Sequence, residues 1–101
     1  MNYTNLFESI KQKALRGTSC DIDSIMEILN EADLPITRAV DFYLGYVSNS
    51  IGIERLEYYL FSGTQIQRNY CCLFFARRNE WELINKAYNE GRIDKIQAYS
   101  R

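Results

Sequence analysis

Three cysteines are the residues of this chain whose type is best suited to chemistry. Cys20 stands alone, whereas Cys71 and Cys72 are adjacent. Consecutive side chains on a helix point about 100° apart, and the pair lacks the C-x-x-C spacing of zinc and redox sites. The chain has no histidine, so the commonest general base and metal ligand is missing. We expect reduced cysteines, Cys71 and Cys72 packed in the core, and no metal or other cofactor.

Two pairs of carboxylates are the other candidates for chemistry. Asp21 and Asp23 precede an apolar stretch and read as helix-capping residues. Glu54 and Glu57 are three positions apart, on what we expect to be an exposed helix face. Neither pair has the apolar pocket that tunes a catalytic acid, and no glycine-rich phosphate loop is present. The sequence therefore predicts that the protein is not an enzyme.

Aromatic and basic residues are better candidates for contact with another macromolecule. The chain has eight tyrosines, and its one tryptophan follows two adjacent arginines. Arginine, tyrosine and tryptophan are the side chains most often found at interface hot spots. We predict a partner-binding surface formed by Tyr58, Arg68, Arg77, Arg78 and Trp81. The alternatives are tyrosines at the core margin and arginines that complement a helix dipole.

The elements that must position these residues are short amphipathic helices. Apolar residues recur at helical spacing, and the chain has one proline and five glycines. Two stretches about 30 residues apart, 22–44 and 53–74, each read as helix, turn and helix. The fold class is therefore all-α, with about six or seven helices in stacked antiparallel hairpins, as a short α-solenoid or an orthogonal bundle. The expected helices cover residues 5–16, 21–33, 35–48, 53–61, 65–78, 81–90 and 93–99.

Length and composition indicate one domain, residues 1–101, with a modest core. Residues 1–67 carry five Lys/Arg against nine Asp/Glu, and residues 68–101 carry seven against four, so only the C-terminal third is basic. Residues 1–17 have no apolar signal-peptide segment, and the longest apolar run, residues 70–76, is too short to span a bilayer. We expect a cytoplasmic protein that does not enter a membrane.

Residues 53–94 resemble the second helix and closing turn of ankyrin repeats. Residues 53–67 follow the pattern L-E-I-V-x-x-L-L-x-x-G-A-x-V-N, and residues 76–94 follow A-A-x-x-G-x-x-E-I-V-x-x-L-L-x-x-G and V-N. Residues 70–73 stand in place of T-P-L-H, and Asn79 stands in place of a glycine. A HEAT-like hairpin fits about as well. The resemblance implies a scaffold that binds protein partners, and we expect an interaction or regulatory adaptor. Open ends of a short stack also make a homo-oligomer an alternative.

Residues 28–44 support a second interpretation. They resemble a helix-turn-helix, or the helical part of a RelB-type antitoxin, with Thr37 and Arg38 opening a recognition helix. This resemblance implies a small nucleic-acid-binding regulator in which the helix of residues 34–44 contacts DNA. Asp33 and Asp41 flank that helix and would be repelled by phosphates.

Overall fold

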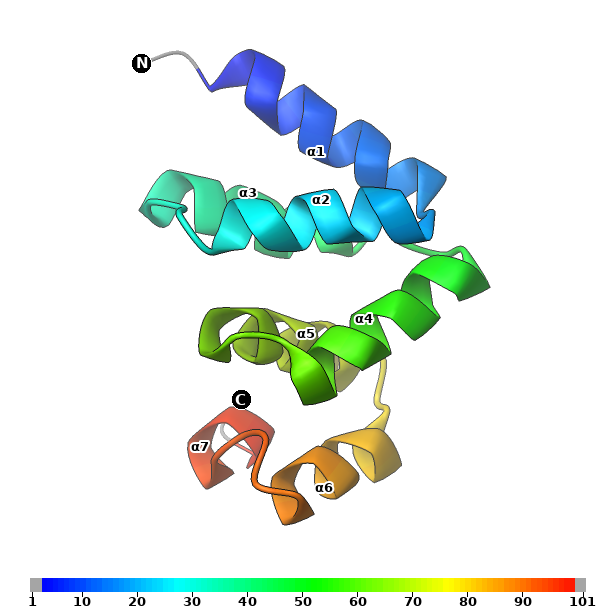
Figure 1. Cartoon of the computed structure of the whole chain (residues 1–101), viewed down its shortest axis with the longest axis vertical. Coiled ribbons are helices and arrows are strands. Elements are labelled where there is room, and N and C mark those ends of the chain that lie inside the picture. The colour runs from blue at the N-terminus through cyan, green and yellow to red at the C-terminus, as the bar shows by residue number, and fades with distance from the viewer. Residues whose placement is uncertain (1–2, 100–101) are drawn as a thin grey trace. The chain divides into compact units, whose positions relative to one another are not determined.

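The computed structural model describes residues 3–99, which form helices joined by short turns (Figure 1). The helices are α1 Thr4–Arg16, α2 Ser19–Leu29, α3 Leu34–Leu44, α4 Ser50–Ser62, α5 Gln65–Arg77, α6 Trp81–Asn89 and α7 Lys95–Tyr99. No strand occurs within residues 3–99. In Figure 1, α2 and α3 run antiparallel, as do α5 and α6. The prediction of an all-α protein built of short helical hairpins is therefore confirmed.

The chain divides into two compact units, residues 1–56 and 57–101, with the boundary inside α4. In the first unit α1 packs on α2 and α3, which also pack on each other. In the second unit α5, α6 and α7 pack on one another. The expectation of a single domain stays a prediction. No helix within residues 3–99 has the length and apolar character needed to cross a membrane.

Threonine side chains start two of the helices through capping boxes. The Thr18 hydroxyl accepts the backbone N–H of Asp21, whose carboxylate in turn accepts the Thr18 backbone N–H. Thr64 and Gln67 make the same exchange at the start of α5. Each box satisfies N–H groups that would otherwise lack a partner in the first turn. The second helix was expected to start at Asp21 or Asp23, but α2 starts at Ser19, two or more residues earlier.

Glycine and proline mark other helix boundaries. Gly17 has φ 62°, the left-handed conformation that ends α1, and its N–H donates to the Lys13 carbonyl. Pro35 lies in the first turn of α3, as expected, after the N-cap residue Asp33. Thr4 was expected to be the N-cap of the first helix, but this position belongs to Tyr3, whose side chain makes no capping hydrogen bond.

The order of the helices along the chain repeats with a period of about 46 residues. Helices α1 and α4 have 13 residues each and begin at positions 4 and 50, and α2 and α5 begin at positions 19 and 65. Helices α3 and α6 begin at positions 34 and 81. The two capping boxes occupy equivalent positions in this register. The two stretches predicted at about 30 residues do form helix pairs, α2–α3 and α4–α5, but equivalent helices are 46 or 47 residues apart.

The buried core follows the same register. Buried residues 46 positions apart are Ile10 and Leu56, Ala14 and Leu60, Ile25 and Cys71, Met26 and Cys72, and Leu29 and Phe75. Each pair occupies the inner face of equivalent helices, although only apolar character is shared. Leu15, expected on the apolar stripe of α1, is 50% exposed. The buried positions of the core therefore recur 46 residues apart, whereas the residue types at those positions differ.

Cysteine reactivity provides a test of this core. Cys71 and Cys72 are buried, and the Cys72 thiol donates to the Gln97 carbonyl, whereas Cys20 is exposed. Burial, and secondly the neighbouring Cys72, raises the pKa of the Cys71 thiol, which suppresses the reactive thiolate. We expect iodoacetamide to label one thiol of the native protein and three in denaturant, with Cys20→Ser removing the native label. Labelling of all three native thiols at one rate would contradict the burial.

Candidate functional site

The turn between α5 and α6 brings together three of the predicted contact residues. The Glu80 N–H donates to the Phe75 carbonyl, and the Asn79 N–H donates to the Ala76 carbonyl. These are the two bonds of a Schellman motif, in which the residue at the position of Asn79 takes a positive φ. Asn79 has φ 60°, so it adopts the conformation of the glycine that it replaces in the ankyrin-like pattern. The turn separates Arg77 and Arg78 from Trp81, the first residue of α6, by only Asn79 and Glu80.

Arg78 and Trp81 present a cation and an aromatic ring to solvent. The Arg78 guanidinium lies over the Phe74 ring, 5.2 Å from its centroid, while the residue remains exposed. This distance suits a cation–π contact, which orients the guanidinium without removing its charge from solvent. Trp81 is 40% exposed. A tryptophan with this much free surface beside an oriented arginine is suited to contact a protein partner.

Tyr58 lies on α4, within the second unit, and is 48% exposed. Its ring packs edge-on against Tyr59, with centroids 5.2 Å apart and ring planes at 81°. Tyr59 is only partly buried, so it supports the outward ring of its neighbour. The adjacent tyrosines therefore divide the two roles that the sequence left open, core margin and exposed contact.

Arg68 has a different environment from the other predicted contact residues. Its Nε donates to the Arg92 carbonyl at 2.7 Å, and its Nη1 donates to the Gly63 carbonyl at 2.6 Å. Nine residues separate Arg68 from Arg77, which is about 14 Å along a helix. The structure thus places Arg68 at the opposite end of α5, where its guanidinium joins the end of α4 to the segment after α6.

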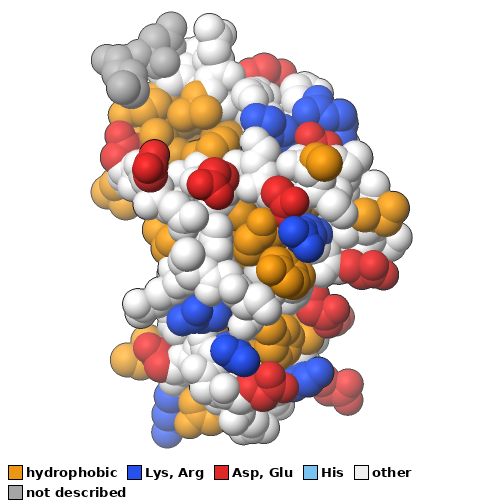
Figure 2. Space-filling model, viewed as in Figure 1, with side chains coloured by type: hydrophobic (Ala, Val, Ile, Leu, Met, Phe, Trp, Pro, Cys, Tyr) orange, Lys and Arg blue, Asp and Glu red, His pale blue; other side chains and the backbone are white. Residues whose placement is uncertain are grey.

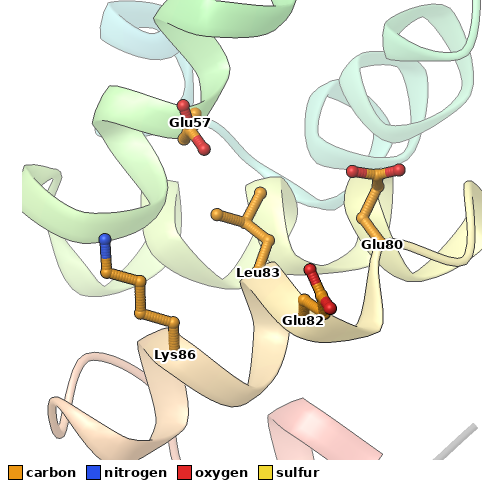
Figure 3. A pocket seen from close by; sticks show the side chains of 5 residues that line it. All are labelled: Glu57, Glu80, Glu82, Leu83 and Lys86. Atoms are coloured by element: carbon orange, nitrogen blue, oxygen red, sulfur yellow. The ribbon is translucent and has the colours of Figure 1, made fainter.

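A shallow hollow in the second unit adds residues that the sequence analysis missed. Its volume is about 330 Å³, and it lies between α4 and α6 (Figure 3). The residues that line it are Glu57, Glu80, Glu82, Leu83 and Lys86. In Figure 3, Leu83 and Lys86 extend from α6 toward α4. The Lys86 amine also lies 5.4 Å from the centroid of the Phe61 ring. The lining carries three acids and one amine, so it favours positively charged groups.

The hollow is adjacent in sequence to the predicted contact residues. Glu57 precedes Tyr58, and Glu80 and Glu82 flank Trp81. Of the residues that line the hollow, the sequence analysis singled out Glu57 alone. The other lining residues are more than 20 positions further along the chain, so no local pattern joins them to Glu57. Within residues 3–99, no three His, Cys, Asp or Glu residues are grouped so that they could hold a metal ion. On the face shown in Figure 2, acidic and basic side chains are interspersed among apolar ones, as at many protein-binding surfaces.

The residues proposed to contact DNA have mixed environments. Thr37 is buried, and its hydroxyl donates to the Leu34 carbonyl at 2.9 Å. The Thr37 side chain is therefore used inside the first turn of α3, so in this alternative contact with DNA would fall to other residues of the helix. Arg38 is exposed. The Asp33 carboxylate accepts the Ile36 N–H and the Tyr3 hydroxyl, which fixes this carboxylate at the start of the helix.

Comparisons with known proteins do not extend this description. No family model matches the chain, and neither a curated protein nor a solved structure matches it. The helical hairpins are compatible with a helical repeat, while membership of the ankyrin or HEAT families stays a prediction.

Proposed function

We propose that this chain is a non-enzymatic, cytoplasmic protein-interaction module, an adaptor or regulator whose scaffold is an ankyrin- or HEAT-like helical repeat. Its partner-binding surface, which we call the α5–α6 surface, consists of Tyr58, Arg77, Arg78 and Trp81. The observation that carries the proposal is the exposure of Trp81 three residues after an arginine oriented over Phe74. Exposed tryptophan and arginine close together are typical of interface hot spots.

The charges around this surface favour a protein partner that presents both signs. Arg77 and Arg78 lie before Trp81, and the acidic hollow with Glu80 and Glu82 adjoins it. Charges of both signs around an aromatic centre resemble the rim of a protein–protein interface. A nucleic acid would meet the carboxylates of the hollow at unfavourable electrostatic cost. The exposed Cys20 and the two buried free thiols support a reducing compartment.

Charge reversal at the α5–α6 turn tests the proposal. We expect Arg77→Glu together with Arg78→Glu to weaken partner binding by at least about tenfold, because two exposed cations at an interface become anions. The measurement is a pull-down from nuclease-treated native lysate, followed by titration of the recovered partner. The matched control is Arg92→Glu with Lys95→Glu, which makes the same change in net charge at two exposed positions of the second unit.

The control separates local contact from general electrostatics. Equal losses in both double variants would contradict a local contact at the α5–α6 turn. Unchanged binding in the Arg77 and Arg78 variant, with native circular dichroism, would exclude this surface. Recovery of nucleic acid alone, when nuclease is omitted, would favour the alternative of a nucleic-acid-binding regulator acting through residues 28–44. Binding of that kind falls steeply with added salt.

A further inference from the structure

The outer face of α3 carries large apolar side chains that the chain itself does not cover. Leu34 is 61% exposed, Phe42 is 64% exposed and Tyr46, in the turn after the helix, is 40% exposed. With Arg38 they recur every fourth position, and we call these four residues the α3 ridge. Residues spaced by four form one continuous ridge on a helix surface. The apolar exposure is therefore concentrated along one line.

The aromatic part of the ridge is held in position by its neighbours. The Phe42 ring contacts Tyr43 and Tyr46 edge-on, with centroids 5.2 and 5.8 Å apart. Tyr43 is only partly exposed and anchors this cluster to the helix. A ring fixed in this way loses little side-chain entropy when another surface covers it. The α3 ridge is thus prepared for contact before a partner arrives.

Arg38 is the charged residue in the middle of the ridge. It is exposed, and within residues 3–99 it makes no hydrogen bond, ion pair or ring contact. The ridge flanks it with Leu34 one turn before and Phe42 one turn after. The other charged residue of α3, Asp41, precedes Phe42, and its side chain points about 100° away from the Phe42 ring. The charge on the ridge itself is therefore the Arg38 cation.

These positions make the ridge complementary to a second copy of itself. Two copies can pair antiparallel about a two-fold axis that crosses the ridge midway between positions 38 and 42. Position 38 of one copy then faces position 42 of the other, and position 34 faces position 46. Arg38 of each copy then lies on Phe42 of the other copy. Leu34 of each copy faces Tyr46 of the other. A closed two-fold interface repeats each contact twice, and ridges of this spacing cross at about 50°.

The geometry points to the α3 ridge as a homodimerisation surface, closed by two reciprocal contacts between Arg38 and Phe42. The charge pattern favours this occupant over the alternatives. Two copies place the Arg38 cation of each on the Phe42 ring of the other, which is a favourable environment for a guanidinium. A nucleic acid would meet a helix of zero net charge with Asp33 at its start. This surface belongs to the first unit and does not depend on the proposed α5–α6 surface.

Sedimentation equilibrium of the full chain under reducing conditions tests this inference. We expect the wild type to dimerise reversibly with increasing concentration. Phe42→Lys places a cation against Arg38 of the other copy twice per dimer, so the dissociation constant rises by at least about 100-fold. The matched control is Ile96→Lys, which adds the same charge at a side chain 73% exposed in the second unit. We expect its dissociation constant to equal that of the wild type.

A charge exchange tests the predicted register. Arg38→Glu alone places a carboxylate on the negative face of the Phe42 ring and weakens the dimer by about 10-fold or more. Arg38→Glu combined with Phe42→Lys restores dimerisation, because positions 38 and 42 of opposite copies then form two ion pairs. Circular dichroism verifies the fold of each variant. If Phe42→Lys fails to fold, Arg38→Glu and the double variant carry the test.

Three results would overturn the inference. The first is a wild-type chain that stays monomeric up to about 1 mM, the weak end of measurable affinity. The second is a dimer that Ile96→Lys weakens as much as Phe42→Lys does, or that the double variant fails to restore. The third is a monomer that retains duplex DNA and releases it on Arg38→Glu, which would assign this face to nucleic acid.

Discussion

Replacing Gly52 by alanine is expected to lower the free energy of unfolding by about 2 kcal/mol or more. A Cβ atom at this position would lie 2.6 Å from the Gly17 carbonyl oxygen and 3.1 Å from Cγ1 of Val47. The oxygen belongs to the turn between α1 and α2, so relief requires movement of backbone. Alanine in place of glycine inside a helix contributes about 1 kcal/mol in the opposite direction, which the overlap exceeds.

Urea denaturation followed by circular dichroism measures this effect. The matched control is Gly45→Ala, at a position with φ −60° where the nearest atom to a Cβ is 3.2 Å away. We expect the control to change the free energy of unfolding by less than about 1 kcal/mol. A Gly52→Ala protein as stable as the wild type would show that helix propensity outweighs the contact and would contradict the close approach of α4 to Gly17.

Asp21→Ala is expected to lower the free energy of unfolding by about 2 kcal/mol. The Asp21 carboxylate is 8% exposed, and it accepts hydrogen bonds from the Thr18 hydroxyl at 2.8 Å and from Nη2 of Arg16 at 2.9 Å. Its removal breaks the capping box of α2 and the ion pair together. The Arg16 side chain is 57% exposed, so the pair itself contributes only a small part of this energy. Thermal and urea unfolding measure the loss.

The same carboxylate makes stability depend on pH in a defined direction. Hydrogen bonding to Arg16, followed by that to Thr18, holds the pKa of Asp21 below its usual value of 3.8, although burial opposes the shift. A lowered pKa in the folded state means that the contribution is complete above about pH 4. It is lost as the pH falls from there through the pKa of the folded protein. Asp21→Asn keeps an oxygen that can cap the helix but removes the charge.

We therefore expect the free energies of unfolding of wild type and Asp21→Asn to converge as the pH is lowered from 5 toward 2. Denaturation at several pH values measures both. A constant difference over this range would contradict a lowered pKa for Asp21. Gln67→Ala is the comparison in the second unit, because it breaks the equivalent capping box at a residue that does not titrate. Its effect should be independent of pH.

The expected end of the first helix, residue 16, agrees with the structure, whereas the expected ends of the second and third helices, residues 33 and 48, lie four residues beyond Leu29 and Leu44. Gly17 and Gly91 take positive φ, which glycine adopts readily and other residues avoid, and Pro35 lies in the opening turn of α3, where its fixed φ suits a helix start. Helix starts depend on which of several polar residues supplies the capping oxygen. Thr18 was overlooked in favour of Asp21, although both take part in one capping box.

The predicted contact residues show which spatial relations cannot be deduced from spacing along the sequence. Arg77, Arg78 and Trp81 lie in one turn, so their proximity followed from the chain itself. Whether Arg68 lies close to them depends on which acceptors its guanidinium reaches. In the structure these acceptors are the carbonyl oxygens of Gly63 and Arg92. The acidic hollow depends on the packing of α4 against α6, which no local pattern indicates.

The repeat period was harder to predict for a related reason. Short helices with an apolar face match one another at many sequence shifts, so residues 22–44 and 53–74 look alike at about 30 residues. The distinguishing signal was the dipeptide Gly-Thr, which occurs at positions 17–18 and again at 63–64. The threonines of these dipeptides are the N-cap residues of the capping boxes of α2 and α5, and they fix the register at 46 residues.

If the chain dimerises through the α3 ridge and binds a partner through the α5–α6 surface, the 46-residue repeat also sets the valency of the protein. The third helix of each internal repeat begins with an exposed large apolar residue, which is Leu34 in α3 and Trp81 in α6. Beyond that residue the outer positions of the two helices differ, so one scaffold carries two surfaces of different chemistry. A chain that pairs through the first surface and binds a partner through the second becomes a bivalent binder on dimerisation. Its apparent affinity for a partner present in repeated copies would exceed that of one site by about 100-fold or more, without any additional contact.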